Sequence, residues 1–438
     1  MAGPVEAVAA IEKDALLPLW TVLGIVTGAL LISLLVKLYT VLTIGKCSSD
    51  VDMAGKTIII TGANTGIGKE TARELARRNA RVILACRNPV KAKEAADDIH
   101  ASTGRSVVLM QLDLCSLNSV RQFARHVLAT EPRLDVLILN AGMMSPPNRE
   151  ETEDGFEATF QANHLGHFLL THLLLDLLRK SKPSRVVVVG SCGQVAGRLN
   201  TEDLSFGRYW FPLLNYCTTK QCNMLFTVEL SRKLTGSGTP SLDRVDRYVQ
   251  LMIICFHNFA CIPGVSVKTD WAKEPFEPNW NKVSVATSSP RHEMQAQRER
   301  CAPEEAISNL PSPNTDSQGG FAVDSHPADI KLRKRQSSES GVTVNCCHPG
   351  FVRSEIAVRS SDIQTWLFNL LLNFYGKSVK EGAETTVYLA VSEEVENVSG
   401  KYFKDCAPTF AVPWATNAAA AKKLYEESIR MTQIKEVI

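Results

Sequence analysis

A tyrosine and a lysine four residues apart have the chemistry and the spacing for proton transfer. They are Tyr216 and Lys220, within the stretch "NYCTTKQCNM". On a helix, positions i and i+4 share a face, so the phenol and the ammonium group would point the same way. A free phenol has a pKa of about 10, and a nearby positive charge lowers that value. The pair therefore predicts an acid–base centre, and the competing interpretation is an ordinary surface pair.

A glycine-rich stretch has the composition of a phosphate-binding loop. The sequence "TGANTGIG" at 61–68 follows a β-branched run and opens a helical stretch. Glycines there permit a tight turn and let backbone N–H groups approach a pyrophosphate at the start of the helix. A glycine-rich loop alone is weak evidence, and the spacing TGxxxGxG is not the commonest fingerprint. Its position after the first buried strand makes it a stronger indication of a dinucleotide site.

Short β-branched runs alternate with helical stretches along most of the chain. The runs are apolar throughout, as are strands that are buried on both faces. Alternation of this kind predicts an α/β fold with a Rossmann-type, doubly wound parallel sheet in a single domain. The expected strands are 56–61, 81–86, 106–114, 134–139, 184–190 and 341–346, and the expected helices include 66–79 and 165–180. Ligands bind such sheets at the carboxyl ends of the strands.

Several short motifs follow one another along the chain in the order that one enzyme family has. They are "TGANTGIG" (61–68), "LDL" (112–114), "NAG" (140–142), "NHLGHF" (163–168), Ser191, "YCTTK" (216–220) and "HPG" (348–350). In this order they resemble the short-chain dehydrogenase/reductase family, and "GANTGIGKETARELA" and "NHLGHFLLTHLLL" are similar to its membrane-anchored retinol dehydrogenase branch. The resemblance implies a domain in two parts, 55–238 and 341–431.

The resemblance also implies a catalytic set of four residues. They are Asn163, Ser191, Tyr216 and Lys220. Tyr216 would be the acid/base and Lys220 its activator, while Ser191 would hydrogen-bond the substrate oxygen. An unremarkable turn serine is the alternative for Ser191. Two positions depart from the family pattern, because Gly190 stands where a second serine is frequent and Leu139 where an asparagine is usual.

The end of the second expected strand indicates the cofactor. NAD-specific relatives place an acidic side chain there, whereas this chain has Cys86 and Arg87. A guanidinium can pair with a 2′-phosphate, so we predict NADP(H), the alternative being a solvated loop arginine. The resemblance implies that Asp113 faces the adenine and Ser354 the carboxamide. The further cofactor contacts that it implies are Gly62, Asn64, Thr65, Gly66, Ile67, Gly68, Leu114, Asn140, Ala141, Gly142, Tyr216, Lys220, Pro349, Gly350 and Val352.

An uncharged apolar stretch lies near the N-terminus. The run "ALLPLWTVLGIVTGALLISLLV" at 15–36 is long enough to cross a bilayer. A cleaved signal peptide is the rival interpretation, but the run exceeds a typical signal core and no clear cleavage site follows. Acidic residues precede the run and lysines follow it, which favours a cytosolic C-terminal side. We predict a tail at 1–14, an anchor at 15–44 and a single-pass protein of the endoplasmic reticulum membrane.

The segment 239–340 interrupts the strand–helix pattern. It is rich in Pro, Ser, Glu and Arg and is apolar only at 251–262, so it lacks the content for a second core. We predict an irregular, disordered insertion, which is either a mispredicted stretch of the gene or a partner-binding loop. A net charge of +2 argues against a nucleic-acid partner, and twelve scattered cysteines without zinc spacing predict no metal site.

These observations predict an enzyme that interconverts a lipophilic alcohol and its aldehyde or ketone with NADP(H). Retinol and retinal are the substrates that the resemblance suggests, and steroids or lipid aldehydes are alternatives. The apolar stretch "IQTWLFNLLLNFYG" at 363–376 suits a bulky apolar substrate or contact with the lipid bilayer. A different class of function is a catalytically weak NADP-binding membrane adaptor with the insertion as its partner site. The resemblance is compatible with a homodimer.

Overall fold

The computed structural model describes most of the chain outside the insertion. The described residues are 27–28, 31–35, 37–208, 210–235, 340–353 and 373–435. The tail, half of the expected anchor, Ser354, nearly all of 239–340 and most of 363–376 therefore lie outside them. Residues 31–35 and 37–42 of the expected anchor are helical. Within the described ranges, no helix is both long enough and apolar enough to span a membrane.

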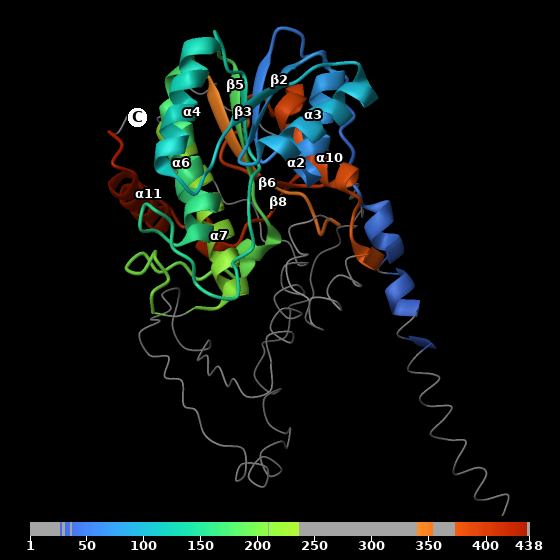
Figure 1. Ribbon diagram of the computed structural model, residues 1–438. Coiled ribbons are helices and arrows are strands. Elements are labelled where there is room, and N and C mark those ends of the chain that lie inside the picture. Colours follow the sequence, from blue (N-terminus) through green and yellow to red (C-terminus); the bar gives the residue numbers. More distant parts are fainter. Residues whose placement is uncertain are drawn as a thin grey trace, which may run out of the picture. The chain divides into compact units, whose positions relative to one another are not determined.

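An eight-stranded sheet forms the centre of the fold (Figure 1). Its order is β3-β2-β1-β4-β5-β6-β7-β8, and only the last pair is antiparallel. The strands are β1 (Thr57–Thr61), β2 (Arg81–Cys86), β3 (Val108–Gln111), β4 (Val136–Leu139), β5 (Ser184–Val189), β6 (Val342–His348), β7 (Tyr402–Lys404) and β8 (Ala407–Thr409). The strand order reverses between β1 and β4, which confirms the predicted doubly wound sheet.

Helices cover both faces of the sheet (Figure 1). Consecutive residues of β1 show why its run is apolar throughout: Ile58 and Ile60 enter one core and Ile59 enters the other. The first core includes side chains of α2 (Gly66–Arg77), α3 (Pro89–Thr103) and α10 (Val379–Val391). The second includes side chains of α4 (Leu117–Thr130), α6 (Gly166–Lys180), α7 (Pro212–Thr235) and α11 (Ala418–Thr432).

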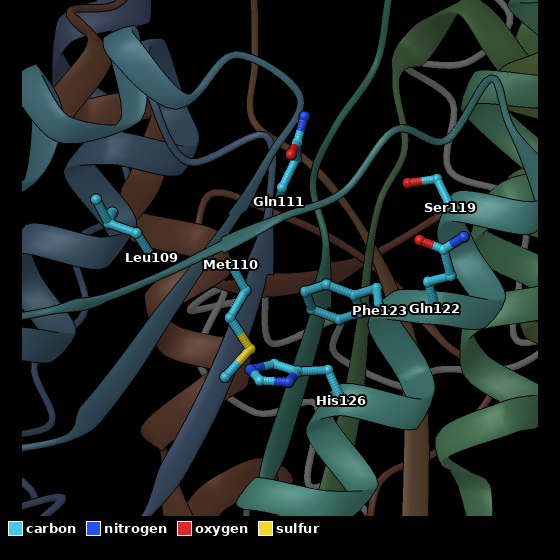
Figure 2. A pocket seen from close by; sticks show the side chains of 7 residues that line it. All are labelled: Leu109, Met110, Gln111, Ser119, Gln122, Phe123 and His126. Atoms are coloured by element: carbon cyan, nitrogen blue, oxygen red, sulfur yellow. The ribbon is translucent and has the colours of Figure 1, made fainter.

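The strand β3 departs from the predicted pattern. We expected 106–114 to be buried on both faces, but β3 spans only 108–111 and alternates between half-buried and exposed residues. The physical reason is its place at the edge of the sheet, where one face is incompletely covered. A hollow of about 420 Å³ lies beside it, and Figure 2 shows Met110 of β3 and His126 of α4 lining that hollow. None of the predicted catalytic residues lines it.

Two other segments differ in detail from the expected elements. Helix α2, expected at 66–79, ends at Arg77 rather than at Asn79, because Asn79 adopts a left-handed backbone with φ of 66°. The expected helix 165–180 begins at Gly166 and is preceded by a π-helical turn, η1 (Gln161–Leu165). Few proteins have π-helical turns, and those that occur are often at functional sites. The turn η1 carries Asn163.

Candidate active site

The four predicted catalytic residues come from three elements beside the carboxyl ends of β4 and β5. Asn163 lies in η1, Ser191 follows β5, and Tyr216 and Lys220 lie on α7. Gly142, which follows β4, brings two of them together. A Cβ atom at Gly142 would lie 3.4 Å from Lys220 Nζ and 3.6 Å from Asn163 Oδ1. A side chain there would therefore crowd both polar groups.

Lys220 is held beneath the Tyr216 ring. Its ammonium group is buried, donates a hydrogen bond of 3.0 Å to the carbonyl oxygen of Val189, and lies 5.7 Å from the Tyr216 ring centroid. Burial lowers the pKa of Lys220 from 10.5 to about 8. Lys220 therefore remains mainly protonated at neutral pH, but it loses its proton at a lower pH than a lysine in water does.

The protein environment of Tyr216 disfavours the ionised phenol. Burial raises the pKa of the Tyr216 phenol above its ordinary value, and a hydrogen bond with Ser191 opposes this effect only in part. In the protein alone, loss of hydration outweighs the favourable contacts of the phenol, whereas the predicted lowering depends on Lys220 together with an oxidised nicotinamide. The phenol is held protonated, as a proton donor must be.

The turn after β5 presents the Ser191 hydroxyl. Ser191 has an extended backbone, and its Oγ accepts a hydrogen bond of 3.1 Å from the Gly193 N–H. The N–H of Cys192, between these two residues, donates to Nδ1 of His348 at 3.2 Å. The absence of a second serine at Gly190 has a steric reason, since a Cβ there would lie 2.6 Å from Cys346 Sγ.

Asn163 joins three segments around the site. Its Oδ1 accepts a hydrogen bond of 2.9 Å from the Met143 N–H. Its Nδ2 donates to the Met143 carbonyl and to Thr219 Oγ1, both at 3.0 Å. The asparagine thus holds the loop after β4 against α7. Sequence reasoning missed Met143 and Thr219, although Thr219 lies inside the quoted "YCTTK" motif.

The glycine-rich turn between β1 and α2 forms a narrow backbone cradle. Gly62 and Gly66 have positive φ values of 65° and 57°, which other residues rarely adopt. A Cβ at Gly68 would lie 2.4 Å from Asn140 Nδ2 and 2.7 Å from the Gly62 carbonyl oxygen. Asn140 Nδ2 donates to the Thr61 carbonyl at 2.8 Å, so this predicted cofactor residue also holds the turn. The same turn contains Asn64, Thr65 and Ile67.

The remaining predicted residues lie in loops at the same edge of the sheet. Arg87 is exposed directly after β2 and makes no ion pair with another described residue. In the loop after β3, burial raises the pKa of the Cys115 thiol, which the charges of Asp113 and Arg87 raise and lower respectively, and the Cys115 N–H donates to Asp113 Oδ1 at 2.9 Å. Gly350 has a φ of 93°. The other loop residues are Leu114, which is buried, Ala141, Pro349 and Val352, which forms a β-bridge with Lys377.

Known proteins resemble this chain over most of its length. A family model described as short chain dehydrogenase matches residues 56–238. Retinol dehydrogenase 12 of Bos taurus is 35% identical, over 89% of this chain and 90% of the relative. Retinol dehydrogenase 13 of Homo sapiens is 34% identical, over 96% of each chain. A crystal structure of an uncharacterized protein from Mycobacterium paratuberculosis is 26% identical with a TM-score of 0.54, and the match covers 90% of this chain and 100% of that one.

Proposed function

Because the chain belongs to the short-chain dehydrogenase family, in its retinol dehydrogenase branch, we propose that it interconverts a lipophilic alcohol and its aldehyde or ketone. The names of its relatives make retinol and retinal the first substrates to test. The observation that carries the proposal is the packing of the half-buried Tyr216 ring over the buried ammonium group of Lys220, beside the Ser191 hydroxyl, in a fold that oxidoreductases of this family use.

A nicotinamide dinucleotide fits the glycine cradle. The turn at 61–68 leaves no room for side chains at Gly62 and Gly68, which is what close approach of a pyrophosphate to the backbone requires. Among the described residues, no acidic side chain occupies the first turn of α2, so its N-terminus suits an anion. When bound, such a cofactor supplies or accepts the hydride.

The reaction then needs a proton at the substrate oxygen. In the direction of reduction, the Tyr216 hydroxyl donates its proton to the oxygen of the former carbonyl, and the Ser191 hydroxyl hydrogen-bonds that oxygen. Tyr216 becomes a phenolate, whose buried negative charge Lys220 stabilises from beneath the ring. In the direction of oxidation, the same phenolate accepts the proton of the alcohol.

The proposed cofactor is NADP(H) rather than NAD(H). The exposed guanidinium of Arg87 follows β2, and no carboxylate stands at that position to accept a ribose hydroxyl. A 2′-phosphate would pair with Arg87, whereas a free ribose hydroxyl would gain much less from it.

A substrate panel tests the proposed function. Purified protein is mixed with NADPH and with retinal, a ketosteroid or an alkyl aldehyde, and the loss of NADPH absorbance is followed. Turnover of at least one of these carbonyl compounds is expected. The absence of turnover on all of them, together with retained NADPH binding, would instead favour the adaptor function.

The membrane location is a second part of the proposal. We propose that residues 15–44 anchor the chain in the endoplasmic reticulum and that the catalytic domain faces the cytosol. The support is the uncharged run at 15–36, followed by Lys37 and Lys46. Protease added outside sealed microsomes should digest the domain, and protection until detergent is added would reverse the orientation.

A further inference from the structure

A buried histidine connects the two halves of the site. His167 lies on α6 and is 3% exposed. Its Nδ1 is 3.3 Å from the carbonyl oxygen of Asn163, in the π-helical turn, and its Nε2 is 2.9 Å from Thr61 Oγ1, at the start of the glycine motif. One imidazole ring thus contacts both the segment with the catalytic asparagine and the segment that would hold the cofactor.

The direction of each hydrogen bond follows from the chemistry of the partners. A carbonyl oxygen only accepts, so Nδ1 of His167 must carry a proton. Burial lowers the pKa of His167 to about 3, so the ring is neutral and Nε2 has a free lone pair. Nε2 therefore accepts the proton of the Thr61 hydroxyl. The other acceptor near that hydroxyl, the carbonyl oxygen of Ile138, is 3.4 Å away.

The Thr61 oxygen is then free to accept from the backbone. The N–H groups of Asn140 and Ala141 both donate to Thr61 Oγ1 at 2.9 Å. These two residues begin the "NAG" motif after β4, and Asn140 also holds the carbonyls of Thr61 and Gly62. The orientation of one hydroxyl group therefore fixes the glycine turn and the loop after β4 together.

We propose that His167 is a positioning residue, which orients the Thr61 hydroxyl and so couples the turn of Asn163 to the cofactor-binding loop. This inference rests on the proposed function in assigning the loop to a cofactor. Removal of the Nε2 acceptor would leave the Thr61 hydroxyl with only the longer contact to Ile138. The hydroxyl would then rotate, and its hold on the Asn140 and Ala141 N–H groups would weaken.

The chain offers a matched control for this proposal. His172 lies on the same helix, is 2% exposed, and also has its Nδ1 at the carbonyl oxygen four residues earlier, that of Phe168 at 2.7 Å. Its Nε2 contacts the Tyr425 hydroxyl at 2.6 Å instead of a residue of the site. His167→Leu and His172→Leu thus each remove two buried hydrogen bonds of an imidazole ring, and only those of His167 reach the glycine motif.

Two measurements test the coupling in the full chain. The first is NADPH affinity by fluorescence, and the second is hydrogen exchange at the amides of Asn140 and Ala141 without added nucleotide. His167→Leu should weaken NADPH binding about tenfold and speed exchange at both amides. His167→Gln should restore most of both properties, since its amide oxygen can accept the hydroxyl proton. His172→Leu should lower the thermal midpoint and leave both properties unchanged.

Each result decides the proposal. Equal effects of His167→Leu and His172→Leu, or unchanged exchange at Asn140 and Ala141 in His167→Leu, would overturn it. If the wild-type chain did not bind NADPH, the proposed function would fail. Hydrogen exchange at Asn140 and Ala141 needs no nucleotide, so it would still test the coupling between His167 and the loop after β4. Should His167→Leu not fold, ¹⁵N spectra of histidine-labelled wild-type protein give the answer, because a proton on Nε2 of His167 would contradict the assignment.

Discussion

Gly190→Ser should destabilise this protein, although it restores a residue that the family often has. Gly190 is buried, and a Cβ atom there would lie 2.6 Å from Cys346 Sγ and 3.3 Å from the carbonyl oxygen of Cys347. Cys346 is itself fully buried on β6, so its thiol has little room to move. Overpacking of a rigid core costs about 1–3 kcal/mol of unfolding free energy. For a domain of this size, each kcal/mol lowers the thermal midpoint by about 2–4 °C.

The clash can be separated from other effects of the serine by a double-mutant cycle. Cys346→Ala removes the colliding sulfur, so Gly190→Ser should cost at least about 1 kcal/mol less in that background than in the wild type. Gly207→Ser is the matched control, because its nearest neighbours lie at 3.7 Å and the substitution should change stability by less than about 0.5 kcal/mol. Urea denaturation gives the unfolding free energies of the four proteins of the cycle and of the Gly207→Ser control. A neutral Gly190→Ser, or strict additivity with Cys346→Ala, would refute the steric argument.

Three other predictions address the cofactor, the lysine and the insertion. Arg87→Asp should lower the ratio of kcat/KM for NADPH over NADH by about 10- to 100-fold, and an unchanged ratio would make Arg87 a solvated loop residue. Because burial lowers the pKa of Lys220 to about 8, the unfolded chain binds more protons above that pH. Urea denaturation should therefore show wild-type stability rising by roughly 2–3 kcal/mol from pH 8 to 10 relative to Lys220→Met, and parallel profiles would contradict the lowered pKa. Deletion of 239–340 should give a chain as active as the full one, since α7 and β6 need only a short connection; loss of NADPH binding on deletion would show that the segment is integrated.

The order of elements could be predicted from sequence because burial on both faces leaves a local signature. Ile58, Ile59 and Ile60 are apolar without alternation, since consecutive residues enter opposite cores. The position of β3 at the edge of the sheet could not be predicted, because strand order depends on pairings between distant segments. Its run is apolar enough to suggest full burial, but the incomplete cover of one face at the edge of the sheet leaves Leu109 exposed.

The residue types of the proposed site could be identified from the sequence, whereas the pKa values of its residues could not. The spacing of Tyr216 and Lys220 correctly places them together on α7, but the pKa of the phenol depends on burial by segments far along the chain. The contact between His167 and Thr61 joins residues 106 positions apart and has no local signal beyond the motifs that contain them. Packing between β5 and β6, which explains Gly190, is likewise a tertiary property.

The central claim is that Tyr216 delivers the proton, and Tyr216→Phe tests it most directly. Tyr216 is half-buried, and Ser191 is its hydrogen-bonding partner, so the substitution removes one oxygen and little else. The measurement compares single-turnover oxidation of bound NADPH by retinal, or by the best carbonyl substrate of the panel, in variant and wild type, with NADPH affinity measured on the same samples. We expect NADPH affinity to stay within about threefold and the rate to fall by a factor of about 100 or more. A variant that binds NADPH normally and reduces the substrate at the wild-type rate would contradict the mechanism.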